Sequence, residues 1–358
     1  MADGFIVRRG GVAADITAAP SINFVSSTFD SITFTITNND ALTADIFWEI
    51  GDSTPDANTL SLAGGATSSN QVASGLDEET SYTIFAFANA ADKAGSQTVS
   101  ITQTTPAEPF DPADLSPQLW LDAADATTIT ASSGSVSQWN NKGSLSNFAQ
   151  ATSAKQPTTG NSTLNGLNVI ESDGDTLVAT NQNEWKFMHD GTKYIFAAVF
   201  RREQDPTNVI LSNISSLSDS GVLLSSRDVV GQVKSLDHSV FRGSGSAPFS
   251  SVNNTVQNVI DLNEWYIYTL IADPSNATAA NRSEIFVDDG TGVKNNTETS
   301  AVSTANPSRT MTLFGFGGDS PSFKGKIAEV IVVSGANATE TNRQDILNYL
   351  NSKWGVYA

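Results

Sequence analysis

Residues 119–129 of the chain read "LWLDAADATTI", and residues 136–143 read "VSQWNNKG". The first three residues, Leu-Trp-Leu, form a short apolar run of the kind that makes a buried strand. Asp122 and Asp125 follow at once, where carboxylates begin turns and where they can also bind a metal ion. The two phrases therefore predict a strand that enters a turn, and they leave both roles open for the aspartates.

Short runs of β-branched and aromatic residues recur along the 358-residue chain, and Gly, Asn, Asp and Ser separate them. Runs of this kind, bounded by turn residues, are typical of strands. The sequence therefore predicts an all-β fold. The clearest runs are residues 31–38, 81–89, 192–200, 265–273, 283–290, 311–318 and 326–335.

One stretch, residues 339–355 ("TETNRQDILNYLNSKWG"), has a helical period. Thr341 and Gln344 have the spacing of a capping box, and Gly355 is typical of a helix end. The sequence predicts one C-terminal helix whose apolar stripe packs on a sheet. The stripe consists of Ile346, Leu347, Leu350 and Trp354.

The chain is too long for one ordinary domain. Residues 104–117 contain four prolines between two strand-rich regions, and proline interrupts sheets while stiffening an extended chain. We therefore expect an N-terminal peptide at 1–18, a first domain at 19–105, a proline-rich linker at 106–115 and a second domain at 116–358.

The composition excludes several partners. The chain has 38 Asp and Glu residues against 19 Lys and Arg residues, a formal charge of −19, so nucleic acid is an unfavourable partner. It has no cysteine. Its first apolar run, Phe5–Val7, is far shorter than the ~7–15 residues of a secretory signal, and no run approaches a membrane span of about 20 residues. We expect a soluble protein that is not inserted in a membrane.

Within the first domain, residues 75–96 resemble the fibronectin type III pattern, with Leu76 six positions before Tyr82. The resemblance implies an immunoglobulin-like sandwich in which the hydroxyl of Tyr82 satisfies a nearby backbone group. The tryptophan of this domain, Trp48, falls on the expected third strand, with Phe34 on the second. This placement leaves a general immunoglobulin-like sandwich open.

The second domain contains five motifs in a fixed order. They are "LWLDA", "WNNKG", "NG" at 165–166, "DG" at 173–174 and the closing stretch 323–356. This order resembles laminin-G-like, concanavalin-A-like sandwich domains of phage virion proteins and bacterial surface proteins. The resemblance covers residues 116–358. It implies a jelly-roll sandwich closed by one helix, and a tailed-phage virion structural protein.

The two motif tryptophans, Trp120 and Trp139, are interpreted as core anchors, with sugar stacking as the alternative. Asp122 and Asp125 are predicted to bond backbone amides in a turn, and a calcium site is the alternative; no other cofactor is expected. Glycan binding is predicted at the polar, aromatic-bearing loop that contains Asn183, Trp185 and Asp190, and the alternative is that Trp185 only covers an edge of the core. These three residues lie between strands and lack core periodicity.

Catalysis is not expected. Glu171, Asp173 and Asp175 alternate as paired carboxylates do in glucanases of this fold, but Gly174 predicts that the strand ends and the carboxylates diverge. His189 and His238 have no catalytic motif around them, and we expect both to be surface residues or satisfied loop residues.

The N-terminal residues Phe5, Ile6, Val7, Arg8 and Arg9 are predicted to attach the chain to a larger acidic assembly by strand addition. The alternative is a chain end without a role. We therefore expect a protein on the exterior surface of a virion, as part of a tail appendage, a fibre or a capsid decoration. Its expected partners are other virion proteins and host-surface glycans, and it is expected to form a homo-oligomer. The alternative is a bacterial extracellular carbohydrate-binding protein or, less favoured, a glycan hydrolase.

Overall fold

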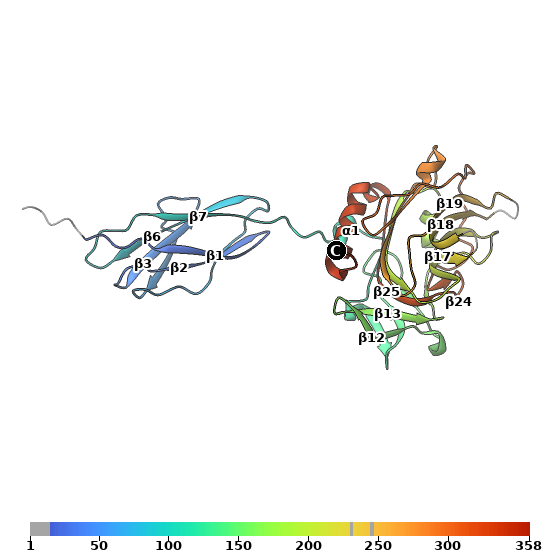
Figure 1. Cartoon of the computed structure of the whole chain (residues 1–358), viewed down its shortest axis with the longest axis horizontal. Helices are drawn as coiled ribbons and strands as arrows, with labels where there is room; N and C mark the ends of the chain where they lie inside the picture. Colours follow the sequence, from blue (N-terminus) through green and yellow to red (C-terminus); the bar gives the residue numbers. More distant parts are fainter. Residues whose placement is uncertain (1–14, 230–231, 244–246) are drawn as a thin grey trace, which may run out of the picture. The chain divides into compact units, whose positions relative to one another are not determined.

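The computed structural model describes residues 15–229, 232–243 and 247–358, and the chain divides into two compact units between Pro109 and Phe110 (Figure 1). This division lies inside the predicted linker. The second half of that linker, however, belongs to the second unit, because Phe110 and Leu115 pack against its core and Pro112–Leu115 form a 3-10 turn, η1. The proline pattern predicted the boundary but not this packing.

The first unit is a sandwich of two antiparallel sheets. One sheet has the order β1-β2-β5 and the other the order β4-β3-β6-β7. The strands are β1 (Ser21–Thr28), β2 (Ser31–Thr37), β3 (Ala44–Ile50), β4 (Asn58–Leu62), β5 (Gln71–Ser74), β6 (Ser81–Ala90) and β7 (Val99–Thr104).

Aromatic residues organise the core of this sandwich. Phe34 on β2 meets Trp48 on β3 edge to face, with ring centroids 4.9 Å apart, so one residue from each sheet joins the layers. The hydroxyl of Tyr82 accepts a hydrogen bond from the backbone amide of Asp77 at 2.8 Å, and Leu76 packs against the same core. The predicted tyrosine corner is therefore confirmed.

The second unit is built around one continuous antiparallel ladder of the order β19-β18-β17-β16-β22-β14-β11-β10-β12-β13-β25-β15-β20-β21. In addition, β8 pairs with β25, β9 pairs with β10, and β23 pairs with β24. The strands are β8 (Leu119–Asp122), β9 (Ile129–Ser132), β10 (Ser135–Trp139), β11 (Phe148–Ala149), β12 (Thr158–Leu164), β13 (Leu167–Asp173), β14 (Leu177–Ala179), β15 (Tyr194–Arg202), β16 (Thr207–Ser212), β17 (Ser220–Val229), β18 (Gln232–Arg242), β19 (Ser250–Val256), β20 (Trp265–Ala272), β21 (Ser283–Val287), β22 (Thr312–Leu313), β23 (Gly315–Phe316), β24 (Ser320–Pro321) and β25 (Lys324–Ser334).

Short 3-10 turns and one helix complete the unit. The turns are η2 (Ala126–Thr128), η3 (Ser153–Lys155), η4 (Asn183–Met188), η5 (Ala279–Arg282) and η6 (Gly335–Asn337), and the helix is α1 (Glu340–Trp354). The prediction of an all-β fold with one C-terminal helix is confirmed.

The ladder folds over itself around a large core, and α1 covers the outside of one half. Strands β15 and β25 are apolar on both faces because they lie between these two layers. Along β15, for example, Phe196 faces the core between the sheets, whereas Ile195 and Ala197 face α1. This arrangement explains the unbroken apolar runs in the sequence.

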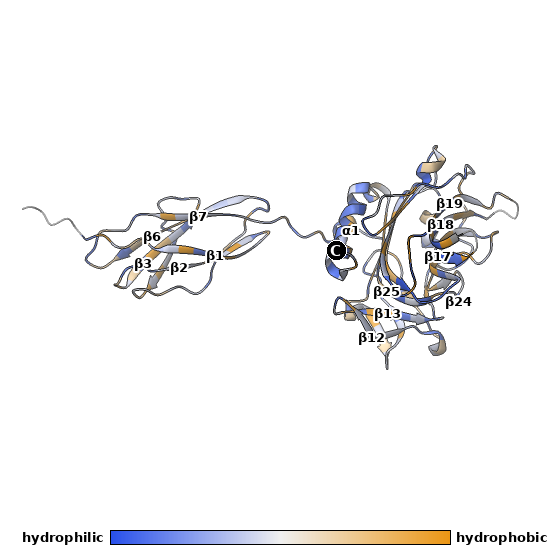
Figure 2. Cartoon of the chain, viewed as in Figure 1, coloured by the Kyte–Doolittle hydropathy of each residue, from blue (hydrophilic) through white to orange (hydrophobic). Residues whose placement is uncertain are grey.

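The helix begins and ends close to the predicted positions. Its N-cap is Thr339, whose hydroxyl accepts from the amide of Asn342 at 3.2 Å, so the predicted capping box at Thr341 is wrong by two residues. Gly355 ends the helix with a φ of 60°, and Trp354 is fully buried. Figure 2 colours most of α1 as hydrophilic, which agrees with a single apolar stripe turned to the sheet.

Among the described residues, no helix combines the length and the apolar character needed to cross a membrane. The predicted attachment residues Phe5–Arg9 lie outside the described residues.

Candidate functional site

The phrases "LWLDA" and "WNNKG" meet in the structure through one side chain, that of Asn141. Its carboxamide oxygen accepts from the amide of Trp120 at 2.8 Å, and its nitrogen donates to the carbonyls of Gln118 and Leu145. A Cβ atom on Gly143 would stand 2.6 Å from the carbonyl oxygen of Pro117, so only glycine fits there. This motif therefore closes the loop between two strands.

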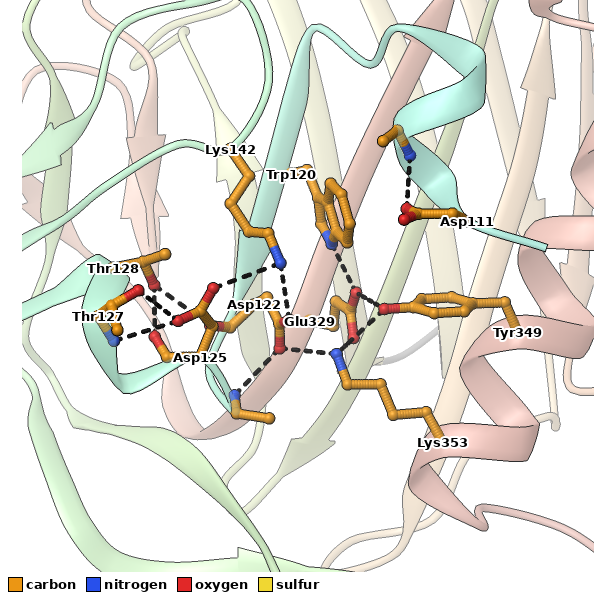
Figure 3. Close-up of polar contacts among 12 residues, drawn as sticks. Asp111, Trp120, Asp122, Asp125, Thr127, Thr128, Lys142, Glu329, Tyr349 and Lys353 are labelled. Atoms are coloured by element: carbon orange, nitrogen blue, oxygen red, sulfur yellow. Dashed lines mark hydrogen bonds and ion pairs between the residues drawn. The ribbon is translucent and has the colours of Figure 1, made fainter. Parts of the chain in front are cut away.

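Trp120 and Trp139 are buried, as predicted for core anchors, so neither ring is available to stack on a sugar. The Nε1 of Trp120 donates a hydrogen bond of 2.7 Å to Glu329, a fully buried carboxylate on β25 (Figure 3). Burial raises the pKa of Glu329, and the nearby carboxylate of Asp122 adds to the rise.

Four donors surround Glu329: Trp120 Nε1, the Tyr349 hydroxyl, Lys353 Nζ and Trp354 Nε1, at 2.7, 3.0, 2.7 and 2.7 Å. Because all four neighbours donate, the arrangement suits an ionised carboxylate, which only accepts. Three of these donors belong to α1. The cluster therefore joins the helix to the sheet and serves the fold.

Asp122 and Asp125 form the predicted backbone bonds: Asp122 accepts from the amide of Ala124 at 3.1 Å and Asp125 from that of Thr127 at 3.1 Å. Lys142 pairs with both carboxylates, at 3.3 and 3.4 Å, and Lys353 pairs with Asp122 at 2.7 Å (Figure 3).

The calcium alternative does not fit these residues. Calcium takes six to eight oxygen ligands, whereas here the ammonium groups of Lys142 and Lys353 already balance the carboxylates. Within the part of the chain that the structure describes, no group of three or more Asp, Glu, His or Cys side chains could hold a metal ion. The aspartates are turn residues.

The predicted glycan site is wrong at its central residue, and the alternative, that Trp185 covers an edge of the core, is confirmed. Trp185 lies in η4, is 0% exposed and contacts Phe148 edge to face, with centroids 5.6 Å apart, so no sugar can reach its ring. Asp190 accepts from the amide and hydroxyl of Thr192 at 3.0 and 2.8 Å, and Asn183 is exposed at the start of η4. These residues cap a core edge.

The carboxylates of "ESDGD" behave as predicted. Strand β13 ends at Asp173, Gly174 has a φ of 85°, and Asp173 pairs with Lys324 at 2.6 Å. A second acid, Glu203, joins Glu171 at Lys326, which lies 2.5 Å from Glu171 and 3.1 Å from Glu203. These side chains line a small hollow of about 210 Å³.

The lysine between these two acids disfavours glycosidase chemistry. Partial burial raises the pKa of Glu171, but the bonds from Lys326 and Ser162 outweigh burial and lower the pKa below its usual value. A general acid in glycoside hydrolysis needs the opposite, a raised pKa. The hollow therefore suits an ion-pair network.

Both histidines are buried, so the predicted surface position is wrong. The Nε2 of His189 lies 3.0 Å from the carbonyl oxygen of Ala305, but its buried Nδ1 has no hydrogen-bond partner among the described residues, so the expectation of a satisfied loop residue is met at one ring nitrogen only. His238 lies on β18, 2.7 Å from the Tyr194 hydroxyl and 2.8 Å from Ser283 Oγ. This Ser-His-Tyr arrangement lies inside the core, where no substrate reaches it.

Burial lowers the pKa of His238 to about 3. In the unfolded chain the imidazole of His238 takes up a proton near pH 6.5, whereas in the folded chain it stays neutral. The contribution of the neutral His238 to stability is therefore fully present above pH 6.5 and is lost as the pH drops toward 3. Glutamine at this position still donates and accepts hydrogen bonds but does not titrate. When the pH falls from 7 to 5, we therefore expect the free energy of unfolding of His238→Gln to decrease by ~2 kcal/mol less than that of the unchanged chain. Urea unfolding at both pH values measures the difference. Identical pH dependence would contradict a neutral buried His238.

A groove that the sequence did not reveal lies on the face of β17, β18 and β19 that points away from the main core. Here Leu223 and Phe241 form a separate apolar cluster with Phe249 and Phe316. The groove has a volume of about 470 Å³. Its lining consists of Leu217, Arg227, Ser239, Phe241, Ala247, Pro248, Phe249, Ser250, Asn253 and Glu298.

The polar side chains of this groove are held by neighbouring strands. Ser239 and Asn253 are directly opposite in the ladder, and Ser239 donates to the Asn253 carboxamide at 3.2 Å. Arg227 pairs with the buried Asp237 at 3.5 Å. Burial raises the pKa of Asp237.

Glu298 reaches the groove from the long segment after β21. The buried Asn296 fixes this segment, because its side chain accepts from the amide of Asn253 at 2.8 Å and donates to the carbonyl of Ala279 at 2.7 Å. A carboxylate, an amide, a guanidinium and two phenyl rings thus meet in one concave place. In the sequence, the groove is marked locally only by Phe249 next to a proline, and this pattern is too common to predict a binding site.

No protein-family model and no curated protein matches the chain. The PKD domain of an M14-like peptidase from Thermoplasmatales archaeon SCGC AB-540-F20 is 18% identical, with a TM-score of 0.21, over 26% of this chain and 100% of that domain. A SusE-like protein is 10% identical, with a TM-score of 0.20, over 90% of this chain and 99% of that one. A leech intramolecular trans-sialidase is 14% identical, with a TM-score of 0.31, over 48% of this chain and 25% of that enzyme. At these values the similarities carry no argument about function.

Proposed function

We propose that the second unit is a saccharide-binding module and that the groove on β17, β18 and β19 is its site. The observation that carries the proposal is the meeting of Phe241 and Phe249 with Arg227, Asn253 and Glu298 around one hollow of about 470 Å³. Small-molecule sites are concave, largely apolar and equipped with a few placed polar groups.

The chemistry of the lining fits a sugar. A pyranose ring offers an apolar C–H face, which packs on the half-buried ring of Phe249, and hydroxyls, which exchange hydrogen bonds with amide, carboxylate and guanidinium groups. Phe249 is half-buried, and Asn253 is exposed. Because the chain carries a charge of −19 and Glu298 lines the groove, neutral glycans are favoured over anionic ones.

A glycan array with the full chain tests this proposal, and we expect binding to neutral bacterial-surface glycans. Asn253→Ala and Glu298→Gln should each weaken binding about tenfold, the value of one hydrogen bond to a bound ligand. Glu264→Gln removes an exposed acid that does not line the groove, so it is the matched control and should bind as the unchanged chain does.

Absence of binding to every glycan, or equal binding by all three variants, would rule out this groove. The same glycans are also assayed for cleavage, because we propose binding without hydrolysis. Product release that disappears in Glu171→Gln would overturn the non-enzymatic part of the proposal.

The wider role that we propose is attachment at the exterior of a virion, with the first unit as spacer. Its support is the order of motifs in residues 116–358 and the basic apolar segment Phe5–Arg9. Detection of the chain in purified particles, and its loss when Met1–Gly11 is deleted, tests this role. Saccharide binding without particle association would favour the extracellular carbohydrate-binding alternative.

A further inference from the structure

The first unit carries aromatic residues on the side of a sheet where polar residues are usual. On β3 and β6, Trp48 and Ala86 are buried between the two sheets, so the alternate residues face outward. Three of these are half-buried phenylalanines, Phe47, Phe85 and Phe87, which we call the outer aromatic face. An antiparallel sheet with one solvated face normally alternates apolar and polar residues.

The outer aromatic face is ordered and adjoins a hollow. Phe47 and Phe87 are directly opposite in the ladder, with rings stacked at 5.0 Å and 13°. The hollow beside Phe87 has a volume of about 340 Å³. Its other lining residues are Thr54, Pro55, Asp56, Ser96 and Thr98.

The surroundings of this face are acidic. Residues 15–109 contain twelve Asp and Glu residues and a single lysine, Lys93, which pairs with Asp40 at 2.9 Å and Asp15 at 3.5 Å. Glu49 stands directly opposite Phe85 in the ladder, and Asp56 lines the hollow. A segment that docks here should therefore be apolar and positively charged.

The described chain starts beside this face. Thr17 donates to the carbonyl of Ala94 at 2.9 Å, and the amide of Ala94 donates to the carbonyl of Asp15 at 2.9 Å. The next residue, Gly95, adjoins Phe87: a Cβ there would lie 4.0 Å from the Phe87 ring. The segment "FIVRR" at Phe5–Arg9 is apolar and basic, and the six residues from Arg9 to Asp15 span up to about 20 Å.

We propose that Phe5–Arg9 docks on the outer aromatic face of its own first unit. The apolar residues of the segment cover the phenyl rings, and its two arginines face Glu49 and Asp56. The short connection to Asp15 makes the contact intramolecular, with a high effective concentration. Attachment to another protein and docking on this face then compete for the same five residues.

The test is the binding of a fluorescent peptide of residues 4–11, "GFIVRRGG", measured by anisotropy. The chain that begins at Asp15 keeps every described residue and should bind the peptide, whereas the full chain, whose face is already covered, should bind it at least tenfold more weakly. A peptide with both arginines changed to glutamate should not bind. Binding should weaken as salt is added, because salt screens exposed charges.

Two variants of the shorter chain locate the contact. Phe87→Ser and Asp56→Lys should each weaken peptide binding at least fivefold. If circular dichroism shows that Phe87→Ser does not fold, Asp56→Lys alone tests whether the peptide binds at this face. Val72→Ser removes a residue that is 54% exposed on the other sheet and should leave binding unchanged. Equal peptide binding by the full and shorter chains, or binding that both face variants leave intact, would overturn the proposal.

Discussion

Replacement of Glu329 by alanine is expected to lower the free energy of unfolding of the second unit by about 3–5 kcal/mol, the cost of breaking a buried ion pair from one side. The carboxylate is fully buried and bonds Trp120, Tyr349, Lys353 and Trp354. Alanine leaves buried donors without an acceptor and removes one of the two buried carboxylates that pair with Lys353, and each unpaired group adds its own desolvation cost.

Urea unfolding followed by tryptophan fluorescence measures this loss, since five of the six tryptophans lie in the second unit. Glu329→Gln should lose less, because it keeps one acceptor oxygen and nearly the same shape. Glu264→Gln, at an exposed position, should change stability by less than about 0.5 kcal/mol. A loss below about 1 kcal/mol in Glu329→Ala would contradict the role of this carboxylate in holding α1.

Trp354→Ala is expected to destabilise the second unit by ~3–5 kcal/mol, the range for a large aromatic removed from a core. Trp354 is 0% exposed in the layer between α1 and the sheet. Its loss opens a cavity, and it also removes the donor that bonds Glu329 at 2.7 Å.

Trp354→Phe separates these two contributions, because it keeps most of the apolar volume but loses the indole nitrogen. We expect it to cost about 1.5–3 kcal/mol, the value of a hydrogen bond to a charged group. Combined with Glu329→Gln, its effect should be less than additive, since both changes remove the same contact. A change below about 1 kcal/mol for Trp354→Ala in urea melts would mean that α1 is peripheral to the fold.

Several features of the site region were predictable because they depend on neighbours in the sequence. Asp122 and Asp125 bond amides two residues away, as short acidic side chains do in turns. Tyr82 reaches an amide five residues upstream, within one strand connection. Gly174 ends β13 where the "DG" turn required it.

Other features required the tertiary structure. The loop around Trp185 is polar in sequence, yet η4 turns the ring toward Phe148 and buries it, a contact between residues 37 positions apart. His238 occurs among polar residues, but its strand, β18, pairs with β17 on one side and β19 on the other, and its imidazole faces Tyr194 in the core. Polar composition alone does not distinguish a surface loop from a segment packed inward by distant strands.

The sequence by itself determined the strand-rich character of the chain, the single helix and the stripe by which it packs, because alternation of period two and recurrence of period 3.6 are local consequences of backbone geometry. Only the tertiary structure decided which residues meet: Lys353 reaches Asp122 and Glu329, and Glu298 reaches Asn253 and Phe241 in the groove. The physical reason is that strand order, which brings distant segments together, is fixed by the packing of the whole unit, and no short stretch encodes it.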